Sequence, residues 1–168
     1  SFFSVALGRV FNSALAGNSE SHKELADTEI QLEAVISVFP LRGGEDLLRK
    51  LFEPLGYEVE TEPIALDENF PEWGESPYSK VVLKANKRLR DLLTHLYVLI
   101  PVLDNEKHYW VGEEEVEKLL RRGHPWLATH PERETIARRY LKYRSNLARE
   151  ALARLLPEES ITPELEFS

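Results

Sequence analysis

Apolar residues near the start of the chain recur at the spacing of an α-helix. This pattern predicts a strongly apolar first helix over residues 3–15, with Ser4 at its start and Gly17 just after its end. The positions that form the stripe are Phe3, Val5, Ala6, Leu7, Val10, Phe11, Ala14 and Leu15.

Alternation of apolar and polar residues over residues 30–38 predicts a strand with one buried face, because successive side chains of a strand point to opposite sides. Residues 57–60 and 78–84 predict two further strands. The segment between them, residues 62–77, is rich in proline and acidic residues. We expect a loop there, although it is unusually long for one.

Three segments show the apolar stripe of an amphipathic helix, namely residues 45–55, 89–103 and 113–122. Pro54 and Gly56 are expected to end the first of them. In the second, Pro101 is expected to kink or end the helix. The apolar run just before it also fits a buried strand, but its spacing favours the helix.

The C-terminal part of the sequence reads as helical. The motif Thr129-x-x-Glu132 is a helix start signal, and apolar positions continue to Leu155, which predicts one continuous helix, the longest of the chain. The whole pattern predicts an α+β fold: a small, mainly antiparallel sheet of about three or more strands packed with helices, followed by a helical portion, residues 112–156, that ends in the long helix. We expect residues 1–156 to form a single domain and residues 157–168 to be a linker.

Composition narrows the classes of function. The 168 residues carry a net charge of −8, which disfavours autonomous binding to nucleic acid. The absence of cysteine excludes disulfides, thiolate zinc sites and a cysteine nucleophile, and fits a cytoplasmic setting. No apolar run approaches the roughly 20 residues that span a bilayer. Because the chain opens at Ser1 without an initiator Met, we expect a fragment of a longer protein.

No catalytic constellation stands out. Gly43-Gly44 is followed by two acidic residues where a phosphate would approach, so a tight turn explains it better than a cofactor loop. The five histidines lack the spacing of metal ligands, and His124-Pro125 and His130-Pro131 are expected to serve helix boundaries around Trp126. We therefore predict no catalytic residue, no bound cofactor and no metal in this chain.

The segment from Asp104 to Trp110 is the part of the sequence that burial explains least. The simpler interpretation is a loop whose Tyr109 and Trp110 cover the core while charged residues pair in solvent. The functional interpretation is a protein interface, because large aromatic side chains with polar tips are enriched among residues that dominate binding. The residues that we assign to this interface are Trp73, Tyr78, Asp104, Glu106, Lys107, His108, Tyr109 and Trp110.

Several segments together resemble a known family. The strongest are Leu96-Tyr97-Val98-Leu99-Ile100-Pro101-Val102-Leu103-Asp104 and Glu106-Lys107-His108-Tyr109-Trp110-Val111, supported by residues 3–17, 42–45, 51–57 and 70–78. They are similar to the N-terminal half of the bacterial HEN-type RNA 3'-terminal ribose 2'-O-methyltransferase. The methyltransferase domain of that family lies C-terminal to this region, so the resemblance implies a fragment that does not methylate RNA.

The resemblance implies a different task for this half. In that family it associates with the ligase domain of a polynucleotide kinase-phosphatase-ligase and promotes transfer of AMP from ATP to the ligase lysine. ATP and divalent metal would belong to that ligase, S-adenosylmethionine and its metal would belong to the absent methyltransferase domain, and RNA would be reached only through the complex. We expect the module to act by favouring the ATP-competent conformation of its partner.

An alternative hypothesis assigns the chain to recognition of RNA 3' ends for the adjoining methyltransferase. It rests on a basic stripe of six residues, Arg121, Arg122, Arg138, Arg139, Lys142 and Arg144. These residues also occupy polar positions of amphipathic helices, where they would only solvate the surface.

Overall fold

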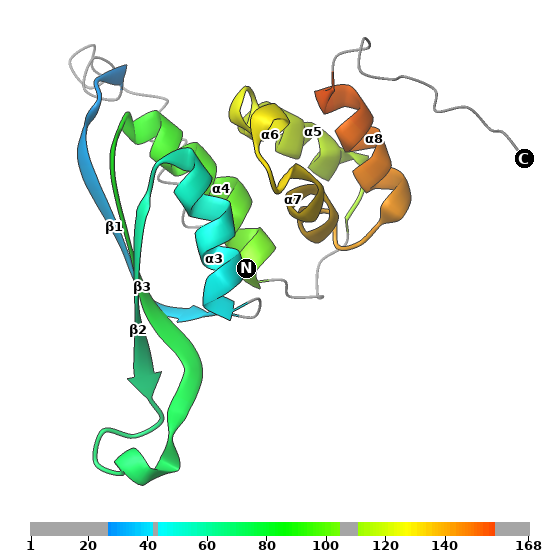
Figure 1. Ribbon diagram of the computed structural model, residues 1–168. Helices are drawn as coiled ribbons and strands as arrows, with labels where there is room; N and C mark the ends of the chain where they lie inside the picture. The colour runs from blue at the N-terminus through cyan, green and yellow to red at the C-terminus, as the bar shows by residue number, and fades with distance from the viewer. Residues whose placement is uncertain (1–26, 42–43, 105–110, 157–168) are drawn as a thin grey trace, which may run out of the picture.

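The computed structural model describes residues 27–41, 44–104 and 111–156 of the chain. Three strands form one antiparallel sheet in the order β1-β3-β2. They span Ile30–Pro40 (β1), Glu58–Ala65 (β2) and Glu75–Lys87 (β3). The α+β class predicted from the sequence is therefore confirmed, with helices packed on the sheet and further helices following it (Figure 1).

The face of β1 that meets the core follows the predicted alternation up to Ile36 and then shifts. The pairing of β1 with β3 changes register between Ile36 and Phe39, as in a β-bulge. Phe39, with 5% of its surface exposed, is therefore buried, while Val38 is 62% exposed. The extra residue reverses which side chains of the strand point inward.

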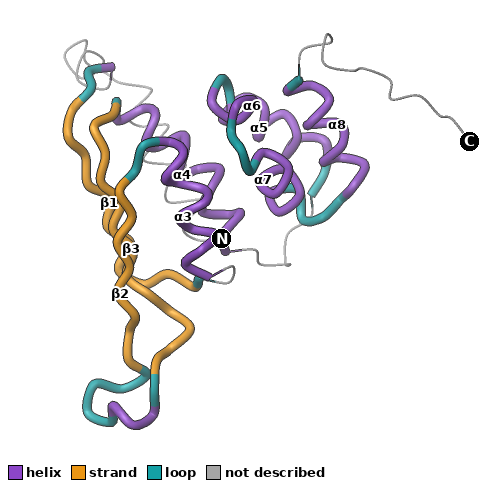
Figure 2. The backbone as a smooth tube through the Cα atoms, in the orientation of Figure 1, coloured by secondary structure: helices purple, strands orange, loops and turns teal. Residues whose placement is uncertain are grey.

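Two helices lie against the same side of the sheet, as Figure 2 shows. Helix α3 spans Gly44–Phe52 and continues into a 3-10 turn, η1, at Glu53–Leu55. Gly56 ends this turn with a φ of 90°, a left-handed conformation that glycine adopts without strain. Helix α4 spans Leu89–Asp104.

Helix α4 is the central element of the fold. It contacts β1 and α3, and it also contacts the helices of the C-terminal portion. Pro101 lies inside this helix and does not end it, so the interpretation of residues 97–100 as a strand is wrong. Val98, Leu99, Val102 and Leu103 are fully buried, which explains why this part of the helix is apolar on nearly every side.

Four helices follow in the C-terminal portion. They span Glu113–Gly123 (α5), Trp126–Thr129 (α6), Arg133–Tyr140 (α7) and Ser145–Leu155 (α8). Helices α5 and α7 contact α4, and α8 contacts α5 and α7. The first of the four agrees with its sequence prediction.

The long C-terminal helix predicted from the sequence is wrong. The chain turns between α7 and α8, where Lys142 and Tyr143 adopt positive φ values of 53° and 60°. The turn folds α8 back onto α5 and buries Leu147, Ala148 and Ala151. Thr129 is not a cap either, because it ends α6. With 16 residues, α4 is instead the longest helix among those that the structure describes.

The predicted loop 62–77 is partly strand, at residues 62–65 and 75–77. β2 and β3 extend to Ala65 and from Glu75, so that only residues 66–74 connect them. The predicted first helix, residues 3–15, lies outside the described residues, as does the linker 157–168. None of the described helices is long and apolar enough to cross a membrane.

Candidate partner interface

The connection between β2 and β3, residues 66–74, is a compact structure that we call the hairpin tip. The Leu66 N–H donates to the Gly74 carbonyl at 3.1 Å and closes the tip at its base. Within it, the side chain of Asp67 accepts the Asn69 N–H at 2.8 Å, and a 3-10 turn, η2, spans Pro71–Trp73. These local bonds give the tip a defined shape without a core of its own.

The hairpin tip presents apolar side chains to solvent. The rings of Phe70 and Trp73 stack with centroids 4.5 Å apart and an angle of 11° between their planes. Trp73 is nevertheless 59% exposed, Phe70 44% and Leu66 56%. An exposed apolar cluster of this kind is typical of a protein interaction site.

The charge around the tip is of one sign. From Glu58 to Ser79 the sequence contains no Lys, Arg or His, whereas Asp67, Glu68 and Glu72 belong to the tip itself. The cluster of aromatic residues is thus framed by carboxylates. It is complementary to an apolar groove with a basic rim.

The described residues that the sequence suggested for a partner interface lie on separate elements of the structure. Trp73 lies in the tip, and Tyr78, 43% exposed, lies on β3 opposite Pro40. Asp104 is the last residue of α4. In Figure 1 the end of the β2–β3 hairpin projects beyond the helices, whereas α4 ends among them, so Asp104 and the tip do not form one patch. Glu106, Lys107, His108, Tyr109 and Trp110 lie outside the described residues.

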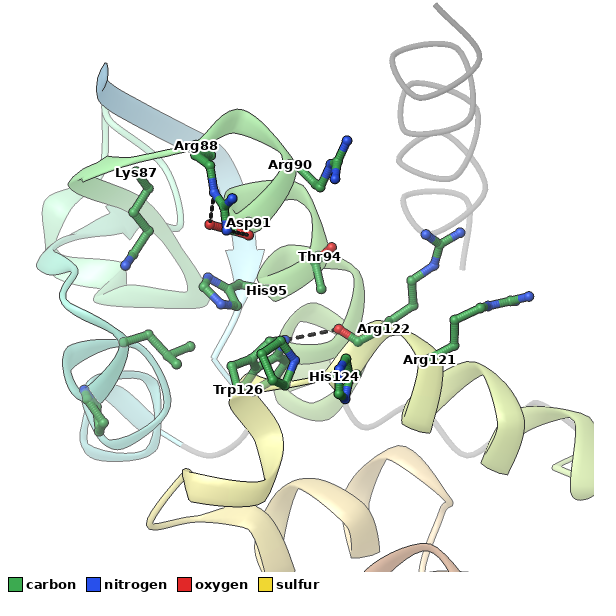
Figure 3. Close-up of a pocket in the computed structure, with 13 residues that line it drawn as sticks. Lys87, Arg88, Arg90, Asp91, Thr94, His95, Arg121, Arg122, His124 and Trp126 are labelled. Atoms are coloured by element: carbon green, nitrogen blue, oxygen red, sulfur yellow. Dashed lines mark hydrogen bonds and ion pairs between the residues drawn. The ribbon is translucent and has the colours of Figure 1, made fainter. Parts of the chain in front are cut away.

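A second feature lies between the start of α4 and the α5–α6 turn. It is a cavity of about 580 Å³, which we call the basic pocket (Figure 3). Arg121 and Arg122 reach it from the end of α5, together with three basic residues near the start of α4. Its lining residues are Pro54, Leu55, Lys87, Arg88, Arg90, Asp91, Thr94, His95, Arg121, Arg122, His124, Pro125 and Trp126.

The six residues of the basic stripe suggested by the sequence therefore do not all belong to this pocket. Only Arg121 and Arg122 of its six residues line the basic pocket. The sequence reasoning missed the other cations, Lys87, Arg88 and Arg90. Their spacing at the junction of β3 and α4 was the available signal, because Lys87-Arg88-Leu89-Arg90 is the densest basic run in the chain.

Two residues that line the basic pocket, His95 and Trp126, belong to a cluster of aromatic rings that continues behind it to Tyr57. The Tyr57 hydroxyl and His95 Nδ1 are 2.7 Å apart in a buried hydrogen bond. Trp126 packs edge-on against His95, with centroids 5.0 Å apart, and donates its indole N–H to the Arg122 carbonyl at 3.0 Å. Burial, with a smaller effect of Lys87, lowers the pKa of His95 to about 4, so this imidazole is neutral at pH 7.

Among the described residues, no group of three or more His, Asp or Glu side chains is arranged to hold a metal ion. The geometry is instead that of a module with an exposed aromatic tip and a separate basic pocket. A comparison with curated proteins gives no match. A family model, described as the RNA repair, ligase-Pnkp-associating region of Hen1, matches residues 1–156. This match covers nearly the whole chain, and the chain therefore belongs to the family of the ligase-Pnkp-associating region of Hen1.

Proposed function

We propose that this chain is the non-catalytic module that binds the ligase domain of Pnkp, a polynucleotide kinase-phosphatase-ligase, and activates it. The activation consists of promoting AMP transfer from ATP to the ligase lysine, with release of pyrophosphate. The observation that carries this proposal is the family match over residues 1–156, because its description names association with ligase and Pnkp in RNA repair. That description is of an associating region and not of a catalytic domain.

The hairpin tip is the contact that we propose for the ligase. A stacked pair of exposed aromatic rings supplies a large apolar area at a small cost in side-chain entropy, since the two rings already hold each other in place. The surrounding carboxylates favour a basic rim, which an enzyme that handles ATP and RNA offers. Tyr78, Asp104 and residues 106–110 remain in the proposed interface as a second contact.

Activation requires more than binding. The module shifts the ligase toward its ATP-competent conformation only if it binds that conformation more tightly than the idle one. A tenfold difference in affinity, equivalent to about 1.4 kcal/mol, shifts the ratio of the two conformations tenfold. ATP, divalent metal and RNA would then contact the ligase, and no residue of this chain needs to touch them.

We also propose that residues 157–168 lead to a methyltransferase domain of a longer parent protein, which would hold S-adenosylmethionine and its metal. The end of the family match at residue 156 supports this division. The bacterial cytoplasm is the compartment that we propose for the repair reaction.

The test is a ligase adenylylation assay, which measures lysine-AMP formation from labelled ATP with and without this chain. The chain is expected to form a complex with Pnkp and to raise the yield of lysine-AMP. Trp73→Ala is expected to weaken binding roughly 30-fold, because truncation of a central aromatic contact costs about 2 kcal/mol.

The matched control is Tyr143→Ala, which removes an aromatic side chain of nearly equal exposure, 58% against 59%, from the α7–α8 turn. It should bind and activate like the native chain. If neither binding nor activation occurs with well-folded native protein, the proposed function is wrong. If both persist in Trp73→Ala, only the placement of the interface is wrong.

A further inference from the structure

The basic pocket collects positive charge in a chain whose net charge is −8. Among the described residues that line it, five are Lys or Arg and one, Asp91, is acidic. The proposed contact with the ligase uses none of these residues. Gathering like charges around one cavity destabilises the fold unless an opposite charge joins them, so this arrangement favours an anionic ligand.

The ion pairs that Arg88 and Arg90 make leave these two side chains available to such a ligand. Arg88 lies 2.9 Å from Asp91, and Arg90 lies 3.1 Å from Asp27, but each of these side chains is at least 38% exposed. Exposed ion pairs are weak, and a bound phosphate competes with them readily. Arg121 is exposed at the end of α5.

Arg122 adds a partly desolvated charge. Its guanidinium lies over the Tyr97 ring, 5.3 Å from the centroid. Burial is the larger effect that lowers the pKa of Arg122, and the neighbouring Arg121 lowers it further. Keeping the Arg122 guanidinium charged therefore costs free energy. An anion between these arginines and Arg90 would offset that cost. Figure 3 shows Arg90 extending from α4 and Arg121 and Arg122 extending from α5.

The aromatic residues that line the pocket indicate which class of anionic ligand it binds. Trp126 is fixed by its bond to the Arg122 carbonyl and by edge-on contact with His95, and His124 lies beside it in the pocket. The carboxylates of an acidic peptide would pair with the basic side chains but would not use the aromatic rings. A nucleotide presents a phosphate to the arginines and a flat base to the aromatic rings, and thereby uses both features.

We propose that the basic pocket binds a phosphorylated nucleotide unit, with its phosphate between Arg90 and Arg121 and its base against Trp126 and His124. The unit is supplied either by a free nucleotide or by the phosphorylated end of a polynucleotide strand. This inference goes beyond the proposed function, because it assigns a ligand to this chain itself and does not require the ligase.

Binding to the full chain separates the two sources. A labelled single-stranded RNA with a 5'-phosphate is titrated by fluorescence anisotropy, in competition with the same RNA lacking the phosphate, with AMP, with inorganic phosphate and with a glutamate-rich peptide. The phosphorylated RNA or AMP is expected to bind at least tenfold more tightly than inorganic phosphate. The stronger of these two ligands identifies the source.

The decisive variant is Arg90→Glu with Arg121→Glu, and its control is Arg138→Glu with Arg149→Glu, two exposed arginines outside the basic pocket. The two double variants change the net charge equally. The pocket variant is expected to lose at least tenfold in affinity and the control less than threefold. Thermal unfolding monitored by circular dichroism checks that each variant is folded.

Three results would overturn the proposal. One is equal loss in the two double variants, which indicates diffuse attraction to the surface. Another is tighter binding of the glutamate-rich peptide than of any nucleotide, and the third is no binding at 150 mM salt. Trp73→Ala should bind the nucleotide like the native chain, so failure here is distinguishable from failure of the ligase proposal.

Discussion

His130 is a buried neutral side chain that uses both ring nitrogens. Its Nε2 lies 2.8 Å from the Leu51 carbonyl and must donate, which leaves Nδ1 to accept the Glu132 N–H at 3.0 Å. The ring is 2% exposed. One imidazole thus links the end of α3 to the start of α7, two segments far apart in the sequence.

We expect His130→Ala to lower the free energy of unfolding by about 2–4 kcal/mol, because it leaves the buried Leu51 carbonyl and the partly buried Glu132 N–H without this partner. Urea denaturation measures this loss. His124→Ala, at an exposed histidine, is the control and should change stability by less than about 0.5 kcal/mol. Equal stability of the two variants would contradict the bridging role.

His95 makes stability depend on pH. Burial lowers its pKa from 6.5 to about 4 in the folded chain, so between these values the unfolded chain binds the proton more readily. The contribution of His95 to the free energy of unfolding is therefore fully present above pH 6.5 and is lost as the pH falls through 4. The loss amounts to about 3 kcal/mol.

His95→Gln tests this at the same position, since glutamine does not titrate and can still pair with the Tyr57 hydroxyl. The native chain is expected to lose stability more steeply than the variant between pH 6.5 and 4, in urea titrations at several pH values. Subtracting the two curves removes the contribution of the carboxylates. Parallel curves would show that His95 is protonated as easily when folded as when unfolded.

At the scale of elements, the β2–β3 hairpin separates a structural part from an exposed end. The strands contribute the buried Val59, Val81 and Leu83 to the core, whereas Leu66, Phe70 and Trp73 of the tip are exposed. Replacing residues 66–74 by Asn-Gly, which favours a tight hairpin turn, should therefore leave the fold intact.

This shortened hairpin is expected to keep the melting temperature within a few degrees of the native value and to lose binding to Pnkp. Calorimetry and a pull-down with Pnkp check the two outcomes separately. A large drop in melting temperature would mean that the tip stabilises the sheet. If the shortened hairpin still binds Pnkp, the interface lies on another surface of the chain.

The α7–α8 turn shows an element boundary that local signals do not reveal. The residues of the turn, 141–144, contain no glycine or proline, and two of them adopt a left-handed conformation that is unfavourable for side chains with a Cβ. Packing of α8 on α5 offsets this cost. Glu117 and Arg154 join the two helices by an ion pair at their surface.

At the scale of the whole molecule, α4 joins the sheet to the helical portion. Leu99 is fully buried within it. Leu99→Ala is expected to lower the free energy of unfolding by about 2–5 kcal/mol through the cavity that it leaves. Because α4 packs against both the sheet and the C-terminal helices, calorimetry should still show a single unfolding transition. Two separate transitions would contradict this shared core.

Charge is also organised at this scale. The hairpin tip is acidic and the basic pocket is cationic, and they lie on different parts of the structure (Figures 1 and 3). The net charge of −8 alone disfavours nucleotide ligands, because it averages over these two surfaces. The distribution of charge, and not its sum, decides which ligand each surface attracts.

The sequence by itself determined the elements whose periodicity is local. The strand at residues 30–38, the helix that starts after Gly43 and the helix at residues 113–122 are set by which face of each segment is apolar. It also indicated the family, and it indicated Trp73 as a contact residue, which stays a prediction.

Only the tertiary structure decided which distant residues meet. Lys87 and Arg121 line one pocket because α5 packs on α4, and no local pattern encodes that approach. The break between α7 and α8 has the same origin. Helical periodicity continues through residues 141–144, but burial of Leu147 and Ala151 against neighbouring helices stabilises the bent arrangement over the straight one.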